Sequence, residues 1–568
     1  MELVKKILLS ILVVIGIAFA GVIICLGVMI VAPSVRIFGY SYLNTSAEKV
    51  KTAVSTDIAN IETIKNGTYN FVIETTDFDV EIASSNTVND KIVFDMTNNV
   101  IGFTNSMDSN KFAKVSVNYD ESSKTMTVKV TEPTGWFLKA NRVLRIQIPQ
   151  NLYENNTVNL KTLSNNGTMT FGETGSQKLR INDIESSCTG LKGSVNFKNA
   201  GVNGTLKIKN IFGRILVNDN LSGNVVVDST IGTYIFKSVG NLEVVASTEE
   251  GKINNPSITV DDCNNLTYNA ESGYLKVNGK VYGDLEVHTD SANIDVNTTV
   301  NDVFVENNNG KTSISQVGSL STDASKSSWN MEDDGSAEAI AIMEKPVVIN
   351  SKDGDIYVGS SLFRLGLTST KGKITVNNAY RKVQATSEYG AINISFKDAS
   401  SLPVDSFDQE SNTVNAYINS KLLNLLDTTQ SMLDVKNTYG YIVVSNIRSA
   451  IDINATESQI ELKYLQVKGA SNISTSSKQV SLKTPLDNFI LITKQNKNSN
   501  AKYLVKYASI QLNNYPTYEQ STDSNGKISR YTEDNYQCAR FLVNSASEGM
   551  TNVITIINTT GAIIAEKI

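Results

Sequence analysis

Residues 365–394 read LGLTSTKGKITVNNAYRKVQATSEYGAINI, and this stretch decides the fold. Its first half alternates apolar and polar residues on both sides of a glycine, at Leu365, Leu367, Gly372, Ile374 and Val376. The same pattern returns eighteen residues later, at Val383, Ala385, Gly390, Ile392 and Ile394. A repeat of strands with a fixed period of roughly 20 residues is typical of a solenoid. The stretch therefore predicts an all-β fold, a single-stranded β-solenoid.

The glycine of this repeat keeps one register along most of the chain. It stands at positions 167, 193, 213, 232, 251, 273, 310, 354, 372, 390 and 440, and Ala292, Ser458 and Lys478 hold the same slot. The second and fourth residues after the slot are mostly apolar with a polar residue between them, as in a half-buried strand. A third apolar position follows later, as in Leu221, Val281, Val300, Leu362 and Tyr380. We therefore predict β-helix-like coils of about 18–20 residues, with three faces around a dry core.

The composition agrees with many short strands joined by tight turns. The chain has 35 glycines and 8 prolines, and glycine suits turns that need a positive φ. The 51 basic and 57 acidic residues leave a net charge of −6, which offers no basic footprint for nucleic acid. Three cysteines lie beyond the N-terminal apolar stretch, Cys188, Cys263 and Cys538, and none forms a CxxC pair. We interpret them as buried free thiols rather than as disulfides.

The N-terminus predicts a membrane anchor. Residues 7–32 are apolar apart from Ser10, and this run exceeds the roughly 20 residues that a helix needs to cross a bilayer. Apolar residues continue far beyond the small-residue sequence at 18–20, so we expect an uncleaved signal anchor. Long soluble domains translocate largely regardless of charge. We therefore expect residues 1–6 in the cytoplasm and everything after Pro33 outside the cell membrane.

The rest of the chain divides where its pattern changes. In chain order we expect a juxtamembrane spacer at 33–62, an N-terminal β module at 63–150, solenoid repeats at 151–485 with inserts near 315–345 and 395–432, and a C-terminal β cap at 486–568. The β module should cap the first coil, because an open sheet end exposes unpaired backbone groups and invites aggregation.

Few residues carry chemistry. The single histidine, His288, is expected on the outer face, with Glu306 at the equivalent position one coil later. A cross-strand His–Glu pair is the simplest interpretation, because aligned neighbours commonly pair on a sheet face. No nucleophile motif points to His288, and the sequence has no zinc spacing, Walker loop or dinucleotide fingerprint. We therefore predict neither catalytic residues nor a cofactor.

One pair of acids falls in register on neighbouring coils. Asp434 lies six residues before Gly440, and Asp452 lies six residues before Ser458. Stacking would place the two carboxylates side by side, where like charges repel unless a cation, a lysine or solvent relieves them. Asp434 and Asp452 are therefore either two solvated surface residues or an acid pair or Ca²⁺ site, and they are the metal candidates of this sequence.

Tyrosines gather toward the C-terminus, at positions 503, 507, 515, 518, 531 and 536. Tyrosine offers rigid contact area with a polar tip, so this group predicts either an aromatic binding surface or a small closing core.

The repeats and the module before them resemble a bacterial family. The module ends in Arg145-Ile146-Gln147-Ile148-Pro149, and the repeats follow the form S/T-x-x-G-x-I-x-V. Over roughly residues 63–482 these features resemble the adhesin-like β-strand-repeat family, whose members are often membrane-anchored and largely of unknown function. The resemblance implies a repeat geometry and an envelope location, and it implies no catalytic residue.

We therefore predict a membrane-anchored, non-catalytic solenoid with a structural, adhesive or envelope-sensing role. Its expected partners are the membrane, through the N-terminal helix, and a cell-envelope glycan or surface protein, with no nucleic acid. The alternative is a carbohydrate-active enzyme, a polysaccharide lyase or hydrolase on the same scaffold. A carboxylate-lined groove along one face would favour the enzyme, and a mixed polar surface would favour the binding protein.

Overall fold

The computed structural model describes most of the chain. The described residues are 2–44, 49–50, 67–76, 78–85, 92–104, 114–131, 135–164, 166–188, 193–210, 213–228, 231–245, 255–319, 346–397, 432–466, 468–484, 488–499, 503–507, 510–513, 528–543 and 546–567. Most of the inserts expected near 315–345 and 395–432 lies outside them. The chain forms two compact units, Met1–Lys237 (the N-terminal unit) and Ser238–Ile568 (the C-terminal unit).

The N-terminal unit begins with the predicted apolar helix. Helix α1 (Glu2–Val31) contains the segment Lys5–Val31, which has a mean hydropathy of 3.1. It is the only helix among the described residues that is long and apolar enough to cross a membrane. Its length and composition fit a single-pass membrane anchor. The second helix, α2 (Gln150–Asn155), instead buries Leu152 and Tyr153.

The strands of the N-terminal unit stack as coils. Their bounds are β1 (Ser41–Asn44), β2 (Lys49–Val50), β3 (Thr68–Glu74), β4 (Asp79–Ser85), β5 (Val93–Thr104), β6 (Lys114–Asp120), β7 (Thr125–Thr131), β8 (Gly135–Pro149), β9 (Thr157–Ser164), β10 (Thr168–Phe171), β11 (Leu179–Ile181), β12 (Ile184–Cys188), β13 (Ser194–Phe197), β14 (Ala200–Val202), β15 (Thr205–Asn210), β16 (Arg214–Asn220) and β17 (Asn224–Asp228). The division between the units falls within β18 (Ile231–Val239).

Parallel pairing builds each face of this unit. One sheet runs β7–β3–β9–β12–β15–β17, and a second runs β8–β4–β10–β13–β16. Strands β11 and β14 pair in parallel as a short third sheet. In these two coils, the third face that the sequence predicts is formed by a separate strand, β11 or β14.

Antiparallel strands close the outer end of the N-terminal unit. The first coil in the sequence, β3 and β4, lies inside the stack, between β9 and β10 on one side and β7 and β8 on the other. Strand β6 covers β7, strand β5 covers β8, and β1 and β2 pair with β5, all antiparallel. This arrangement occupies edges that would otherwise be free to pair with another chain.

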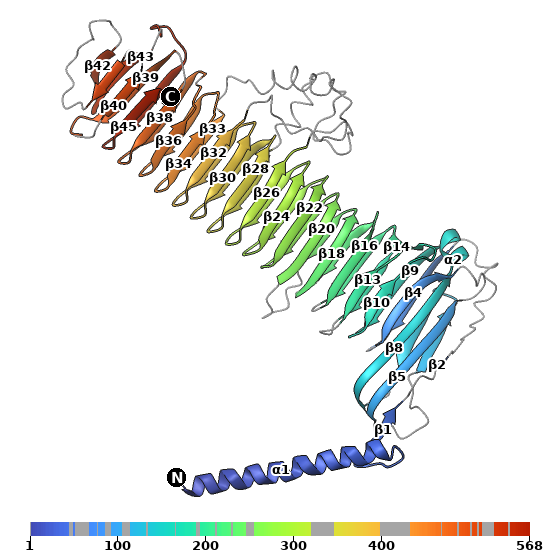
Figure 1. Cartoon of the computed structure of the whole chain (residues 1–568). Helices are drawn as coiled ribbons and strands as arrows, with labels where there is room; N and C mark the ends of the chain where they lie inside the picture. The colour runs from blue at the N-terminus through green and yellow to red at the C-terminus, as the bar shows by residue number, and fades with distance from the viewer. Residues whose placement is uncertain are drawn as a thin grey trace. The chain divides into compact units, whose positions relative to one another are not determined.

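The C-terminal unit is a longer stack of the same kind (Figure 1). Its strands are β19 (Leu242–Val245), β20 (Asn255–Cys263), β21 (Leu266–Ala270), β22 (Tyr274–Val281), β23 (Leu285–Thr289), β24 (Asn293–Thr299), β25 (Val303–Asn307), β26 (Thr312–Val317), β27 (Pro346–Ser351), β28 (Ile356–Ser361), β29 (Arg364–Ser369), β30 (Ile374–Ala379), β31 (Val383–Ser387), β32 (Ile392–Phe396), β33 (Leu433–Asn437), β34 (Tyr441–Ser445), β35 (Ile451–Ala455), β36 (Gln459–Lys463), β37 (Ala470–Thr475), β38 (Val480–Thr484), β39 (Phe489–Asn496), β40 (Tyr503–Tyr507), β41 (Ile510–Asn513), β42 (Ile528–Glu533), β43 (Tyr536–Val543), β44 (Val553–Asn558) and β45 (Ile563–Lys567).

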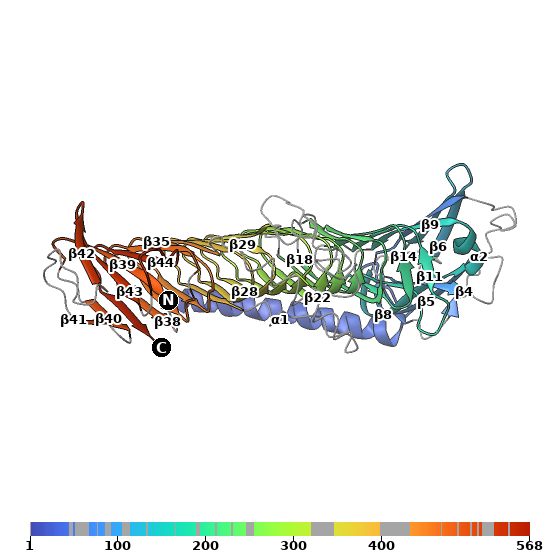
Figure 2. The same ribbon diagram turned by 90° about the horizontal axis from the view of Figure 1, so that it is seen from above.

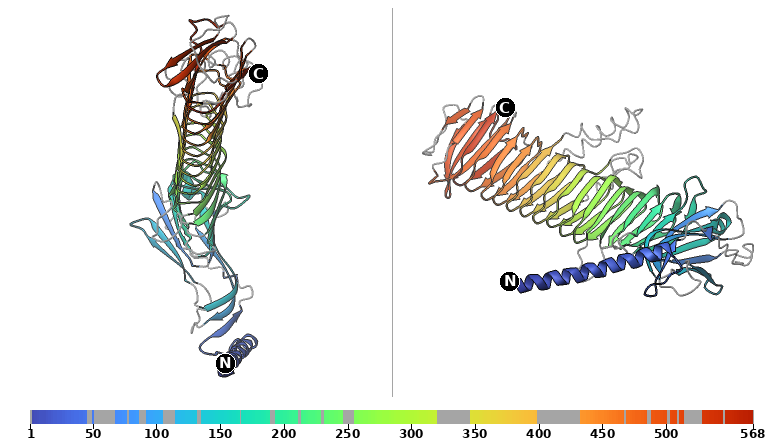
Figure 3. Two further views of the ribbon diagram at one scale, coloured as in Figure 1. Left: turned by 90° about the vertical axis from the view of Figure 1, so that its left-hand side faces the viewer. Right: turned by 60° about the horizontal axis from the view of Figure 1, so that its bottom comes forward.

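Two parallel sheets form the walls of this unit. The odd-numbered strands β19 to β37 pair in sequence as sheet 1, and the even-numbered strands β20 to β38 pair as sheet 2. Figure 2 shows β29 and β35 in one row and β28 and β38 in the other, and Figure 3 shows the coils one behind another. The solenoid predicted from the sequence is confirmed.

The predicted register holds in the core. Ile374 pairs with Ile392 on adjacent sheet-2 strands, and both side chains are fully buried. The third apolar positions, from Leu221 to Tyr380, are also buried. In the C-terminal unit they follow the sheet-2 strand closely, and the pairing of β30 with β32 shifts register between Val376 and Ala379. Burial thus follows the repeat throughout these coils.

The repeat glycines are needed for a reason other than the positive φ that the glycine-rich composition suggested. Of those in the register, only Gly273 has a positive φ among the described residues. At Gly372 a Cβ would instead lie 1.9 Å from the carbonyl oxygen of Gly354, one coil away. Three residues before the slot a buried polar side chain binds this turn: Ser387 Oγ accepts from the Gly390 amide at 2.9 Å. Backbone crowding between coils, rather than turn conformation, requires glycine here.

The C-terminal end repeats the closing device. Strands β44 and β45 form a further coil beside β37 and β38, in a region the sequence assigned to the cap. Strands β39 and β40, earlier in the chain, lie outside this coil. Antiparallel β43 and β42 then cover β39, and β41 covers β40. The outermost coil is again not the terminal one in sequence.

The cysteines are free thiols, as predicted. Cys188, Cys263 and Cys538 are each buried, and none of them forms a disulfide. Burial raises the pKa of the Cys188 and Cys263 thiols to about 12, so both remain protonated and unreactive at neutral pH.

Candidate functional site

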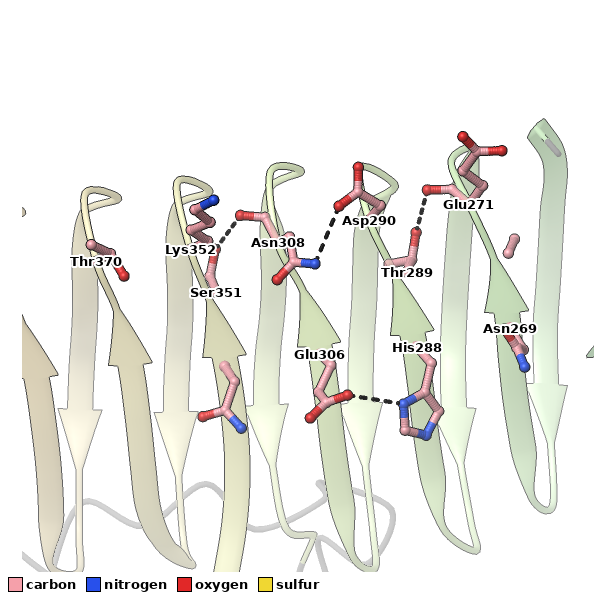
Figure 4. Close-up of a pocket in the computed structure, with 12 residues that line it drawn as sticks. Asn269, Glu271, His288, Thr289, Asp290, Glu306, Asn308, Ser351, Lys352 and Thr370 are labelled. Atoms are coloured by element: carbon pink, nitrogen blue, oxygen red, sulfur yellow. Dashed lines mark hydrogen bonds and ion pairs between the residues drawn. The ribbon is translucent and has the colours of Figure 1, made fainter. Parts of the chain in front are cut away.

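A polar groove crosses the end of sheet 1 in the C-terminal unit, where the chain turns toward sheet 2 (Figure 4). It has a volume of about 690 Å³ and spans β21, β23, β25 and β27, the turns that follow them, and Thr370 directly after β29. Two of its three carboxylates, those of Glu306 and Asp290, have partners in the groove. Glu306 contacts His288, and Asn308 Nδ2 donates to Asp290 Oδ1 at 3.2 Å. The groove therefore presents amide, hydroxyl and charged groups in a mixed arrangement.

His288 forms the predicted cross-strand pair and a second contact that the sequence did not indicate. Its Nδ1 lies 3.2 Å from Glu306 Oε2 on the neighbouring strand, and its Nε2 lies 3.0 Å from Glu286 Oε1 on the same strand. The ring also packs against Phe304 with a centroid distance of 5.4 Å. Both nitrogens can donate only when the ring is protonated. The hydrogen bond to Glu286, and then that to Glu306, raise the pKa of His288, and burial partly opposes them.

This raised pKa predicts a pH dependence that can be measured at one residue. The protonated ring stabilises the folded state at pH values below the unfolded pKa of about 6.5, and the contribution disappears as the pH rises through the higher folded pKa. Because the side chain is 38% exposed, solvent screening keeps the effect on stability small. NMR titration is unambiguous, since the chain has one histidine. Glu286→Gln should lower its pKa more than Glu306→Gln, and an unshifted titration in the unmodified protein would contradict the two-carboxylate arrangement.

Asp434 and Asp452 lie where the sequence placed them. They are directly paired on β33 and β35, and Gln384 and Asn472 continue the same row on either side. Asp434 is half-buried and Asp452 is exposed. No group of three or more His, Cys, Asp or Glu residues suited to a metal ion occurs in the described part of the chain. The row offers two carboxylates flanked by amides, a sparse ligand set for Ca²⁺, which prefers 6–8 oxygens.

Calcium therefore tests the nature of this pair. We expect millimolar Ca²⁺ to leave the melting temperature unchanged, because a weakly bound ion adds little to folded-state stability. The combined change Asp434→Asn and Asp452→Asn should keep or slightly raise the melting temperature by removing like-charge repulsion. A calcium-dependent rise that the double variant abolishes would identify a cation site instead.

A second polar groove lies farther along sheet 1, beside two exposed tyrosines. It has a volume of about 420 Å³, and its lining includes Thr386, Glu388, Lys436, Thr438, Asn454 and Thr456. Tyr389 and Tyr439 follow directly on Glu388 and Thr438 in the turns of adjacent coils. Their rings stack with centroids 5.3 Å apart and an angle of 11° between planes.

These two tyrosines are exposed despite their contact. Their relative exposures are 52% and 50%, so the outer surfaces of both rings face solvent. The pKa of Tyr389 is raised by the side chain of Glu388, which keeps its phenol protonated. Sequence analysis missed this pair because 50 positions separate the residues. The signal was present, since each stands directly before a repeat glycine, Gly390 and Gly440.

The C-terminal tyrosines do not gather into a comparable surface among the described side chains. Tyr531 and Tyr536 are half-buried on β42 and β43, and burial raises the pKa of Tyr531. The side chains at 503, 507, 515 and 518 lie outside the described residues.

Comparison with known protein families finds a similarity in one part of the chain. No curated protein and no solved structure matches the chain. A family model, however, matches a region that covers about a quarter of the sequence and includes His288 and Tyr389. Residues 278–419, a range that includes strands β23 to β32, are similar to the family described as Toastrack DUF4097, a domain of unknown function.

Proposed function

We propose that the protein is a single-pass, membrane-anchored binding protein without catalytic activity, and that its C-terminal unit holds a glycan of the cell envelope on the outer side of the membrane. The observation that carries this proposal is the exposed Tyr389–Tyr439 stack beside a groove of hydroxyl, amide and charged groups. Tyrosine provides rigid, amphipathic contact area at low entropic cost. Polar groups beside it can satisfy sugar hydroxyls, so the pair and groove suit a pyranose chain.

The arrangement of charges supports binding rather than cleavage. Glycoside hydrolysis needs two carboxylates flanking one bond at a defined separation, with one of them raised in pKa. Glu306 and Asp290 in the first groove are engaged by His288 and Asn308. Asp434 and Asp452 stand in an open row with flanking amides. These contacts fit a polar surface for recognition, an adhesive role.

The covered sheet edges support a location at the cell surface, where the protein meets other chains. In each unit antiparallel strands cover the parallel edges at one end of the stack. Covered edges protect a surface protein from edge-to-edge association. Helix α1 supplies the proposed anchor, and the proposal places its C-terminal end on the outer side of the membrane.

Binding of labelled glycan to whole cells tests the proposal and its orientation together. Cells that express the full chain should bind fluorescent fragments of purified peptidoglycan, and Tyr389→Ala with Tyr439→Ala should reduce that binding by about tenfold, since two stacked aromatics contribute over 1 kcal/mol. Tyr464→Ala is the matched control, because Tyr464 is 52% exposed in the same unit but belongs to no groove described here. Binding that appears only after permeabilisation would contradict the orientation, and equal loss in the control would contradict the site.

A further inference from the structure

An unusual turn follows helix α1. Ile37 and Tyr40 form an isolated antiparallel bridge, with each amide donating to the other's carbonyl at 3.0 Å. The two residues between them, Phe38 and Gly39, have φ values of 52° and 83°. Such a turn favours Asn or Gly at its first position, and a bulky residue there stores backbone strain.

Phe38 is also the most exposed large apolar side chain outside α1 in the described part of the chain. It is 91% exposed, whereas no other such residue beyond α1 exceeds 52%. The sequence thus accepts both a strained backbone and a solvated aromatic ring at one position. The two backbone hydrogen bonds hold the turn but leave the Phe38 ring exposed, and an exposed aromatic ring on a strained backbone marks a place where something else binds.

A groove lies between this turn and α1. It has a volume of about 620 Å³, and its walls include Gly21, Cys25 and Met29 of α1 and Ile37, Phe38 and Phe103 opposite them. It reaches from Met29 back to Ala18, so it runs along 12 residues of the helix, or roughly 17 Å. Figure 1 shows α1 leading directly into β1 beside β5, the strand that carries Phe103. The turn therefore lies beside the apolar part of α1.

We propose that the 37–40 turn is inserted into the membrane, with Phe38 among the lipid acyl chains and an acyl chain lying in the groove against α1. This inference rests on the proposed membrane anchoring by α1. An acyl chain matches the apolar walls and the elongated form of the groove. Insertion removes Phe38 from water, and the burial of this aromatic side chain among acyl chains offsets the strain of its backbone.

Quenching by brominated lipid tests the insertion in the full chain. Phe38→Trp is reconstituted in phosphatidylcholine vesicles that carry bromine on their acyl chains, and the emission of the unmodified protein, which has two tryptophans, is subtracted. Phe19→Trp, in the middle of α1, reports the anchor itself, and Tyr439→Trp reports an exposed aromatic of the C-terminal unit. We expect a loss of emission at position 38 comparable to that at position 19, and none at position 439.

The outcomes separate this inference from the proposed anchoring. Quenching at position 19 without quenching at position 38 would overturn the inserted turn and leave the anchor in place. Absence of quenching at both positions would overturn the anchoring and with it the inference. A third outcome is that the tryptophan at position 38 is not quenched and that oxidation cross-links Cys25 between two chains. This outcome would assign the groove to a second copy of α1 and would likewise overturn the lipid proposal.

Discussion

Ile374→Asp is expected to lower the melting temperature of the C-terminal unit more than any other single change described here. The Ile374 side chain is fully buried and pairs with Ile356 and Ile392 on the adjacent strands of sheet 2. A carboxylate there loses its hydration and finds apolar neighbours on both sides. Changes of this kind belong to the exceptional class above about 4 kcal/mol in free energy of unfolding.

Thr375→Asp provides the matched control for this prediction. Thr375 is the next residue on the same strand, points to the outer face and is only half-buried, with Tyr357 and Asn393 beside it. Because no carboxylate stands directly opposite, its change should stay within about 0.5 kcal/mol. Thermal unfolding followed by circular dichroism measures both variants. Equal losses of stability in the two variants would mean that the inward and outward faces have been exchanged.

Gly372→Ala is expected to be the second most damaging change, although it adds a single methyl group. Its Cβ would lie 1.9 Å from the Gly354 carbonyl oxygen and 2.4 Å from the Gly354 carbonyl carbon. Both are backbone atoms, so two coils must separate before the methyl group fits. Overpacking of this kind costs about 1–3 kcal/mol, and loss of the close contact between coils places Gly372→Ala at the upper end.

A second glycine in the preceding strand isolates the steric effect. At Gly366 the nearest atom to an added Cβ is the Val347 carbonyl oxygen at 3.6 Å, an ordinary contact. Neither Gly366 nor Gly372 has a positive φ, so backbone strain is the same in both cases. Gly366→Ala should be neutral or stabilising by about 0.5 kcal/mol, because alanine loses less backbone entropy on folding. Similar melting temperatures for the two alanine variants would refute the crowding explanation.

The sequence specifies the coils well because their register repeats locally. Two residues per strand, such as Ile374 and Val376, suffice to assign the inward face. The next coil repeats the pattern with Ile392 and Ile394. The row containing Asp434 and Asp452 followed from the same counting. A periodic signal of this kind needs no knowledge of contacts between distant residues.

Features that depend on neighbouring coils could not be derived in this way. The reason for Gly372 lies in the carbonyl group of Gly354, which periodicity does not reveal. The coil formed by β44 and β45 escaped prediction because the period is interrupted before it resumes at Val553. The Tyr389–Tyr439 stack was hidden by the long interval between repeats. In each case the decisive neighbour is close in space and remote in the sequence.

The insertion of coils at the two closed ends has a consequence for the order of folding. In the middle of the C-terminal unit a coil bonds to a neighbour 18 residues away, as Lys373 does with Asp355. At the closed ends the corresponding separations are 83 residues, between Gly469 and Asn552, and 89 residues, between Gly67 and Asn156. Each doubling of a loop adds about 0.6 kcal/mol to the entropic cost of closing it, and such non-local contacts form slowly. The central coils should therefore fold first. The coil inserted near each closed end should form last, when a segment distant in the sequence pairs with its neighbouring strands.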